Sequence, residues 1–195
     1  MIGEWEKETG KKATVALSAT KDVQDAILND TQRAKLVDII DIRYWHYKVD
    51  GLYAPEGGKN LAPRQHARKM KVGKVTFDEA YRAVSEYRKK FPEKAVTYYA
   101  QNYPDMAWAV FMASGSCSVV PVADESFLTD AAAMDMEDTG TNKYQKLVKS
   151  GIGSIIYSHS ATDIPVHLSP GKYILKSVDP KTGAITVIAK QYSIV

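Results

Sequence analysis

The chain has 195 residues, which is enough for one well-packed core or two small ones. Its composition, 45% hydrophobic and 25% charged, is typical of a soluble globular protein. The 26 basic and 23 acidic residues form no polybasic block, so nucleic acid is not predicted as the main partner. The single cysteine, Cys117, excludes an intramolecular disulfide and a cysteine-based zinc site. No apolar run approaches the ~20 residues that a membrane-spanning helix needs.

Residues 1–123 alternate helical and extended patterns. The sequence first predicts a helix over 2–9 that ends at Gly10, a strand over 13–18 and a helix capped by Thr20 or Ser18. A strand over 36–42 and a helix capped by Thr76 follow. The last two predicted elements are a strand over 94–99 and an apolar helix over 105–113. Strands that alternate with helices favour βαβ units and a parallel sheet. The fold class predicted for this part is therefore α/β.

The pattern changes after residue 123. Residues 124–142 read as a connector with one short helix. Residues 143–195 contain strand candidates at 153–157, 164–168, 173–178 and 184–189, and residues 179–183 form a Pro- and Gly-containing turn. Short apolar-polar alternations of this kind predict a small antiparallel β-sandwich.

The most distinctive segment follows the second predicted strand and reads Asp41-Ile42-Arg43-Tyr44-Trp45-His46-Tyr47. Buried strands are normally rich in Val, Ile and Leu, and they do not gather three rings and three charged or titratable groups in seven residues. Aromatic rings beside fixed charges are typical of a surface that binds a sugar. The alternative is an aromatic-rich strand with structural ion pairs.

Several polar groups are expected at one edge of the parallel sheet. Right-handed crossovers place the carboxyl ends of parallel strands together, and ligands bind at that edge in α/β folds. The segments that follow the three predicted strands are Thr20-Lys21-Asp22, the aromatic segment with its long loop over 46–75, and Gln101-Asn102-Tyr103. A loop of that length is typical of a functional segment.

The segments Leu17–Asp25, Ile40–Tyr47 and Asn60–His66 resemble the C-terminal half of bacterial glycoside hydrolases that consist of a (β/α)₈ barrel followed by a small β-sandwich. The resemblance implies that residues 1–123 form the last three strand-helix units of the barrel. It also implies a carbohydrate substrate, and either a second copy of the chain or a complementing N-terminal half as the partner that covers the open barrel. Relatives of this type are exported, whereas residues 1–8 resemble neither a signal peptide nor a transit peptide.

Most glycoside hydrolases use two carboxylates across the scissile bond. Asp22, His46 and Glu56 are the candidate catalytic residues, with Asp22 as an acid or base and His46 as a proton relay. The alternatives are an acid that complements a helix dipole and a structural histidine. The segment Tyr44-Trp45-His46 carries no acid where many barrel hydrolases hold their nucleophile, so the chain is not expected to be catalytic by itself. No cofactor or metal site is predicted, because His46, His66 and Glu56 lack the spacing of metal ligands.

Arg43 and Arg64 are suited to a bidentate clamp on the carboxylate of a uronic acid, although an ion pair with Asp41 or Asp38 is an equal alternative. The full set of predicted substrate-binding residues is Arg43, Tyr44, Trp45, Arg64, Gln65, His66, Gln101 and Asn102. The predicted function is the C-terminal portion of a glycoside hydrolase that acts on a polysaccharide or oligosaccharide. A carbohydrate-binding accessory module and a non-functional remnant are the alternatives.

Overall fold

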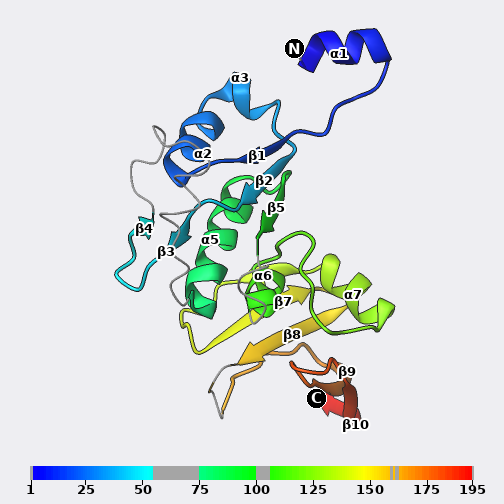
Figure 1. Cartoon of the computed structure of the whole chain (residues 1–195). Coiled ribbons are helices and arrows are strands. Elements are labelled where there is room, and N and C mark those ends of the chain that lie inside the picture. Colours follow the sequence, from blue (N-terminus) through cyan, green and yellow to red (C-terminus); the bar gives the residue numbers. More distant parts are fainter. Residues whose placement is uncertain (1, 55–74, 100–105, 159, 161–162, 195) are drawn as a thin grey trace. The chain divides into compact units, whose positions relative to one another are not determined.

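The computed structural model describes residues 2–54, 75–99, 106–158, 160 and 163–194 (Figure 1). The chain divides into two compact units, residues 1–118 and residues 119–195. Unit 1 combines a parallel sheet with helices, and unit 2 is mostly antiparallel.

The centre of unit 1 is a three-stranded parallel sheet. Its strands are β1 (Ala16–Ser18), β2 (Ile39–Ile42) and β5 (Ala95–Tyr98), in the order β1-β2-β5. Asp41 of β2 lies opposite Ser18 on one neighbour and Thr97 on the other. The sequence prediction that these three segments are adjacent parallel strands is confirmed.

Five helices accompany this sheet in the described part of unit 1. They are α1 (Ile2–Thr9), α2 (Lys21–Leu28), α3 (Thr31–Ala34), α5 (Phe77–Lys90) and α6 (Ala107–Met112). Helix α5 starts at the predicted cap Thr76, whose side chain accepts from the Glu79 backbone while Glu79 accepts from the Thr76 backbone. The helical spacing predicts an inward face of Phe77, Ala80, Tyr81, Val84 and Tyr87. All of these are buried except Tyr81, which is half-buried.

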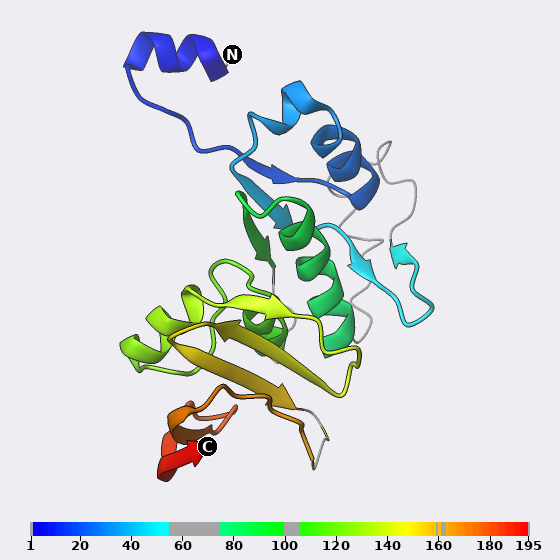
Figure 2. The ribbon, with the colours of Figure 1, turned by 180° about the vertical axis from the view of Figure 1, so that it is seen from behind.

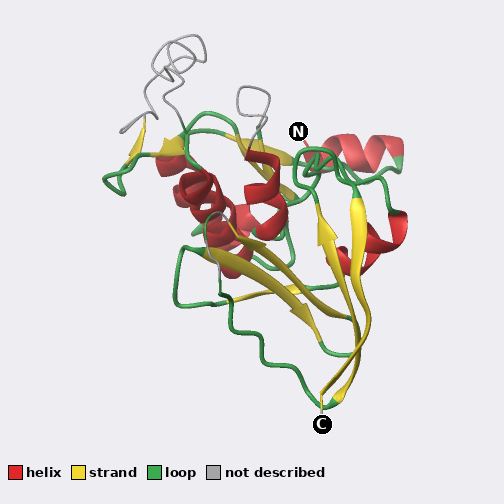
Figure 3. Cartoon of the chain, turned by 90° about the horizontal axis from the view of Figure 1, so that it is seen from below, coloured by secondary structure: helices red, strands yellow, loops and turns green. Residues whose placement is uncertain are grey.

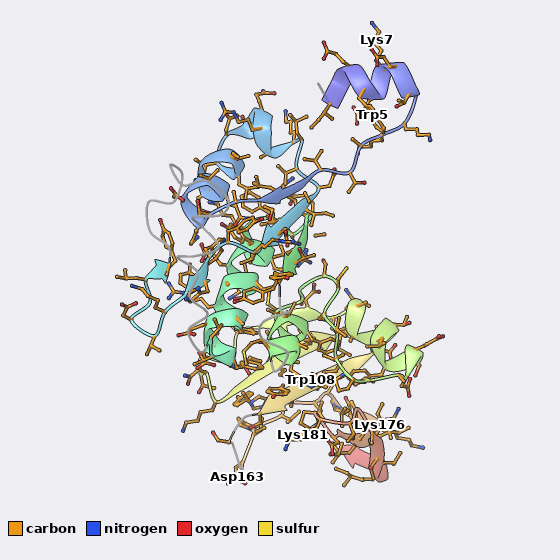
Figure 4. All side chains as sticks on the ribbon, viewed as in Figure 1. Trp5, Lys7, Trp108, Asp163, Lys176 and Lys181 are labelled. Atoms are coloured by element: carbon orange, nitrogen blue, oxygen red, sulfur yellow. The ribbon has the colours of Figure 1, made fainter. Side chains whose placement is uncertain are left out.

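Helices α1 and α2 differ in how much they bury. Helix α1 ends at Gly10, which has a positive φ of 66°, and none of its described residues is buried. Trp5 projects from α1 and is 46% exposed (Figure 4). Helix α2 instead buries Lys21, Gln24 and Leu28, so polar side chains occupy positions that normally hold apolar residues.

The segment after β2 contains a small hairpin that the sequence does not predict. Strand β3 (His46–Tyr47) pairs antiparallel with β4 (Tyr53–Ala54). Arg82 of α5 donates to the Gly51 carbonyl at 3.0 Å and thereby fixes the turn of this hairpin. The first part of the predicted 46–75 loop is therefore structured.

The described part of unit 2 contains two antiparallel sheets. The elements are α7 (Glu125–Ala132), β6 (Asp135–Glu137), β7 (Tyr144–Lys149), β8 (Gly153–Ser158), β9 (Gly171–Val178) and β10 (Ile185–Ile194). Strands β6, β7 and β8 form one sheet, in which β7 and β8 are the long yellow and gold strands of Figure 2. Strands β9 and β10 pair antiparallel and only with each other in the described residues, and they lie side by side in Figure 3, where β10 leads to the C-terminus. The predicted strand at 164–168 is not formed.

The predicted partial (β/α)₈ barrel followed by a small β-sandwich is wrong. The described residues form a mixed α/β structure with several small, separate sheets. Closing a barrel requires strands that tilt and continue their pairing around a ring. The three parallel strands here have only three or four residues each and pair as a short sheet. Strand-helix alternation predicts parallel neighbours, but it does not distinguish a small open sheet from part of a barrel.

Among the described residues, no helix combines the length and the apolar character that crossing a membrane requires.

Close packing around Gly115 gives a test of the core of unit 1. A Cβ atom at Gly115 would lie 2.5 Å from Val110 Cγ1, 2.8 Å from the Val110 carbonyl oxygen and 3.0 Å from Val84 Cγ1. We expect Gly115→Ala to lower the free energy of unfolding by about 2 kcal/mol, because overpacking forces neighbouring atoms apart. Urea denaturation measures the change. Gly3→Ala is the matched control, because nothing lies within 4 Å of its added Cβ, and an equal loss in both variants would contradict the packing.

Candidate functional site

The carboxyl edge of the parallel sheet is organised by one buried amide. Gln24 of α2 is 0% exposed, and its Nε2 donates to the backbone carbonyls of Leu17 at 2.9 Å and Asp41 at 2.8 Å. Its Oε1 accepts from Trp45 Nε1 at 2.7 Å. The two carbonyls belong to β1 and β2, so a single side chain joins α2, two strand ends and the segment that follows β2.

A buried ammonium lies beside this amide. Lys21 Nζ lies 3.0 Å from Asp25 Oδ2 and 2.7 Å from Glu86 Oε1. It also lies 5.1 Å from the ring centroids of Trp45 and Tyr87, and 5.9 Å from that of Tyr47. We call Lys21, its two carboxylates and these three rings the lysine cage. Two carboxylates and three ring faces compensate the buried charge.

The pKa values within the lysine cage favour a fixed structural arrangement. Burial acts to lower the pKa of Lys21, but its hydrogen bonds to Glu86 and Asp25 outweigh burial and raise the pKa. Burial, followed by the hydrogen bond to Glu86, raises the pKa of Tyr47 to about 12. Burial and the charge of Asp25 raise the pKa of Tyr87, whose hydroxyl donates to Asp25 Oδ1 at 2.9 Å. Lys21 therefore stays protonated at neutral pH and is unsuited to nucleophilic chemistry.

A second group of side chains lies at the same edge and is partly open to solvent. Arg43 Nε donates to Asp41 Oδ2 at 2.8 Å, and Thr97 Oγ1 donates to Asp41 Oδ1 at 3.0 Å. The Arg43 guanidinium carbon lies 4.7 Å from the ring centroid of Tyr99. We call Arg43, Asp41, Thr97 and Tyr99 the arginine platform. The Arg43 side chain is 43% exposed while that of Asp41 is 11% exposed, so the buried carboxylate anchors a solvent-facing guanidinium.

His46 is buried on β3 with an exposed fraction of 8%. Its Nδ1 atom has no hydrogen-bond partner among the residues that the structure describes. Burial lowers the pKa of His46, Glu79 opposes this change and Lys48 adds to it. The imidazole is therefore neutral at physiological pH, which is the form that a general base requires.

The predicted site residues fall into three groups. Arg43 and Tyr44 lie at the carboxyl edge with side chains that reach solvent, and Asp22 is half-buried in the first turn of α2. Trp45 is 1% exposed and His46 is buried, so both belong to the core of unit 1. The remaining candidates, Glu56, Arg64, Gln65, His66, Gln101 and Asn102, lie outside the described residues.

Sequence reasoning missed the residues that organise the edge. The apolar residues Val23, Ala26 and Ile27 predict that one face of α2 is buried, and Gln24 lies on a different face. Thr97 and Tyr99 belong to an ordinary strand sequence. The i, i+4 pair of Lys21 and Asp25 at the start of a helix is a weak signal for the lysine cage.

A shallow hollow of about 600 Å³ lies elsewhere, in unit 2. It is lined by Ser177, Val178, Asp179, Pro180, Lys181, Ala184 and Thr186, around the turn between β9 and β10. Lys176 and Lys181 mark this region in Figure 4. None of the predicted site residues lines it, and the converging polar side chains are at the sheet edge instead. No cluster of three or more metal-ligating side chains occurs within the described ranges.

Fold and site together define a small mixed α/β protein with a charged, aromatic sheet edge. The chain belongs to the family described as Domain of unknown function (DUF6298), whose model matches residues 1–134. The match covers all of unit 1, and therefore the whole carboxyl edge, and extends through α7 of unit 2. No curated protein and no solved structure matches the chain.

Replacing the amide of Gln24 tests its organising role. We expect Gln24→Leu to lower the free energy of unfolding by about 3 kcal/mol, because two carbonyls and the Trp45 indole N–H lose their buried partner. Urea denaturation followed by tryptophan fluorescence measures this loss. Gln32→Leu, at an exposed position of α3, is the matched control and should change stability by less than about 0.5 kcal/mol. Equal effects in the two variants would show that the amide is dispensable.

The lowered pKa of His46 predicts how stability depends on pH. In the unfolded chain His46 takes up a proton as the pH falls below ~6.5, whereas its lowered pKa keeps it neutral in the folded protein. Proton uptake therefore favours the unfolded state, and His46 makes the fold less stable as the pH falls below ~6.5. We expect His46→Gln to lose less stability between pH 7.5 and pH 5.5 than the wild type does. Thermal unfolding at both pH values measures the difference, with the exposed His167→Gln as the control. An unchanged pH dependence in His46→Gln would refute the prediction.

Proposed function

We propose that the carboxyl edge of the parallel sheet binds a glycan, as part of a glycoside hydrolase-like protein that acts on a polysaccharide or oligosaccharide. The arginine platform is the observation that supports this proposal most strongly. Tyr99 presents a ring at the edge, Arg43 presents a guanidinium that is held against that ring, and Tyr44 follows directly in the chain. Sugars are bound by aromatic faces for their C–H surfaces and by fixed polar groups for their hydroxyls.

The role proposed for this chain is binding, and catalysis is not proposed for this chain alone. Three of the carboxylates described at this edge are held by protein donors: Asp41 is bound by Arg43 and Thr97, while Asp25 and Glu86 are bound by Lys21 and by tyrosine hydroxyls. A general acid in a glycosidase must carry a proton at neutral pH and reach the glycosidic oxygen. The oxygens of these three carboxylates are already taken up by protein donors, which leaves them poorly placed to contact a glycosidic oxygen.

Binding measurements with tyrosine variants test the proposal. Retention on cellulose, xylan, β-mannan, chitin and polygalacturonate identifies a bound polysaccharide, and calorimetry with its soluble oligosaccharides gives the affinity. We expect Tyr44→Ala and Tyr99→Ala to weaken binding about tenfold, because each removes an aromatic face from the edge. Tyr173→Ala, on β9 of unit 2, is the matched control and should bind like the wild type.

Two outcomes would contradict the proposal. One is that none of the five polysaccharides retains the protein. The other is that the affinity for a retained glycan is unchanged in both Tyr44→Ala and Tyr99→Ala.

A further inference from the structure

The two Nη atoms of Arg43 are not used by Asp41 and can donate hydrogen bonds. A guanidinium carries five N–H groups, and Arg43 uses the one on Nε for Asp41. Within the described ranges its Nη atoms make no hydrogen bond, and the side chain is 43% exposed. The four N–H groups of the two Nη atoms are therefore available to a ligand at the sheet edge.

The orientation of this guanidinium is set by its surroundings. Asp41 is buried between β1 and β5 and is itself held by Thr97 at 3.0 Å, so the Nε side of Arg43 is anchored. The Tyr99 ring, 4.7 Å from the guanidinium carbon, limits rotation of the plane. An anchored planar fork presents two parallel donors, which match the two oxygens of a carboxylate.

From this geometry we infer that the glycan bound at the edge is acidic, and that Arg43 binds the carboxylate of a uronic acid residue through its Nη atoms. The inference rests on the proposed glycan site, and it adds the substrate class. Lysine would not replace Arg43, because an ammonium is a point charge and lacks the paired geometry.

The local charge favours a monoanionic group over a phosphate. Asp41 already neutralises Arg43, with Oδ2 lying 2.8 Å from Nε. A dianionic phosphate bound to Arg43 would bring two negative charges to a guanidinium that Asp41 already compensates. A single carboxylate adds less repulsion and still gains two charge-assisted hydrogen bonds.

Paired acids and esters test the inference. The probes are oligosaccharides of galacturonate, glucuronate and mannuronate, each compared by calorimetry with its methyl ester, which keeps the sugar and removes the charge. We expect at least one acid to bind about tenfold more tightly than its ester, as a solvent-exposed bidentate contact allows. Arg43→Gln and Arg43→Lys should both abolish that preference, and the exposed Arg33→Gln should retain it.

The outcomes separate this inference from the proposed function. Equal affinities for acid and ester in all three pairs would overturn the acidic-glycan inference and leave glycan binding intact. The same holds if the preference for the acid over its ester persists in Arg43→Gln and Arg43→Lys. Absence of binding to every saccharide, neutral or acidic, would overturn both. Arg43→Lys keeps the positive charge beside Asp41, so its thermal unfolding temperature shows whether a lost preference comes from the fork or from misfolding.

Discussion

The carboxyl edge of unit 1 depends on the amide of Gln24. Its Nε2 joins the carbonyls at the ends of β1 and β2, and its Oε1 receives the indole N–H of Trp45. A buried amide leaves little freedom for its partners, because each unpaired polar atom in a dry interior costs free energy. The positions of α2, of the strand ends and of the segment after β2 are therefore coupled.

This coupling divides the edge into an inner part and an outer part with different roles. In the inner part, the lysine cage balances one ammonium with two carboxylates and three ring faces, and its raised tyrosine pKa values keep the hydroxyls protonated. In the outer part, the arginine platform fixes a guanidinium that still faces solvent. Rigid support beneath an exposed polar group is what preorganises a binding surface, since less conformational entropy is lost when the ligand arrives.

Helix α5 and the three parallel strands depend on short-range sequence patterns, and they were predicted correctly. The capping box at Thr76 and the spacing of Phe77, Ala80, Val84 and Tyr87 defined α5, and apolar runs located the three parallel strands. The partial barrel that the family resemblance implied was wrong, because closure depends on long-range pairing that strand-helix alternation does not encode. Arg43 and Tyr44 were placed correctly at the edge, but Trp45 was assigned to the ligand surface, since the Gln24 amide that accepts its indole N–H lies on a different element. The β3–β4 hairpin was missed because two-residue strands carry no periodic signal.

The most direct test is an NMR titration of the isotope-labelled protein with the oligosaccharide that it retains. The Arg43 Nε–H and the backbone amides of Tyr44 and Tyr99 should shift on addition of the sugar, while the Trp45 indole N–H, held by Gln24, stays protected from hydrogen exchange and nearly unshifted. Shifts confined to the hollow between β9 and β10, or an indole N–H that exchanges freely, would contradict a preorganised glycan-binding edge.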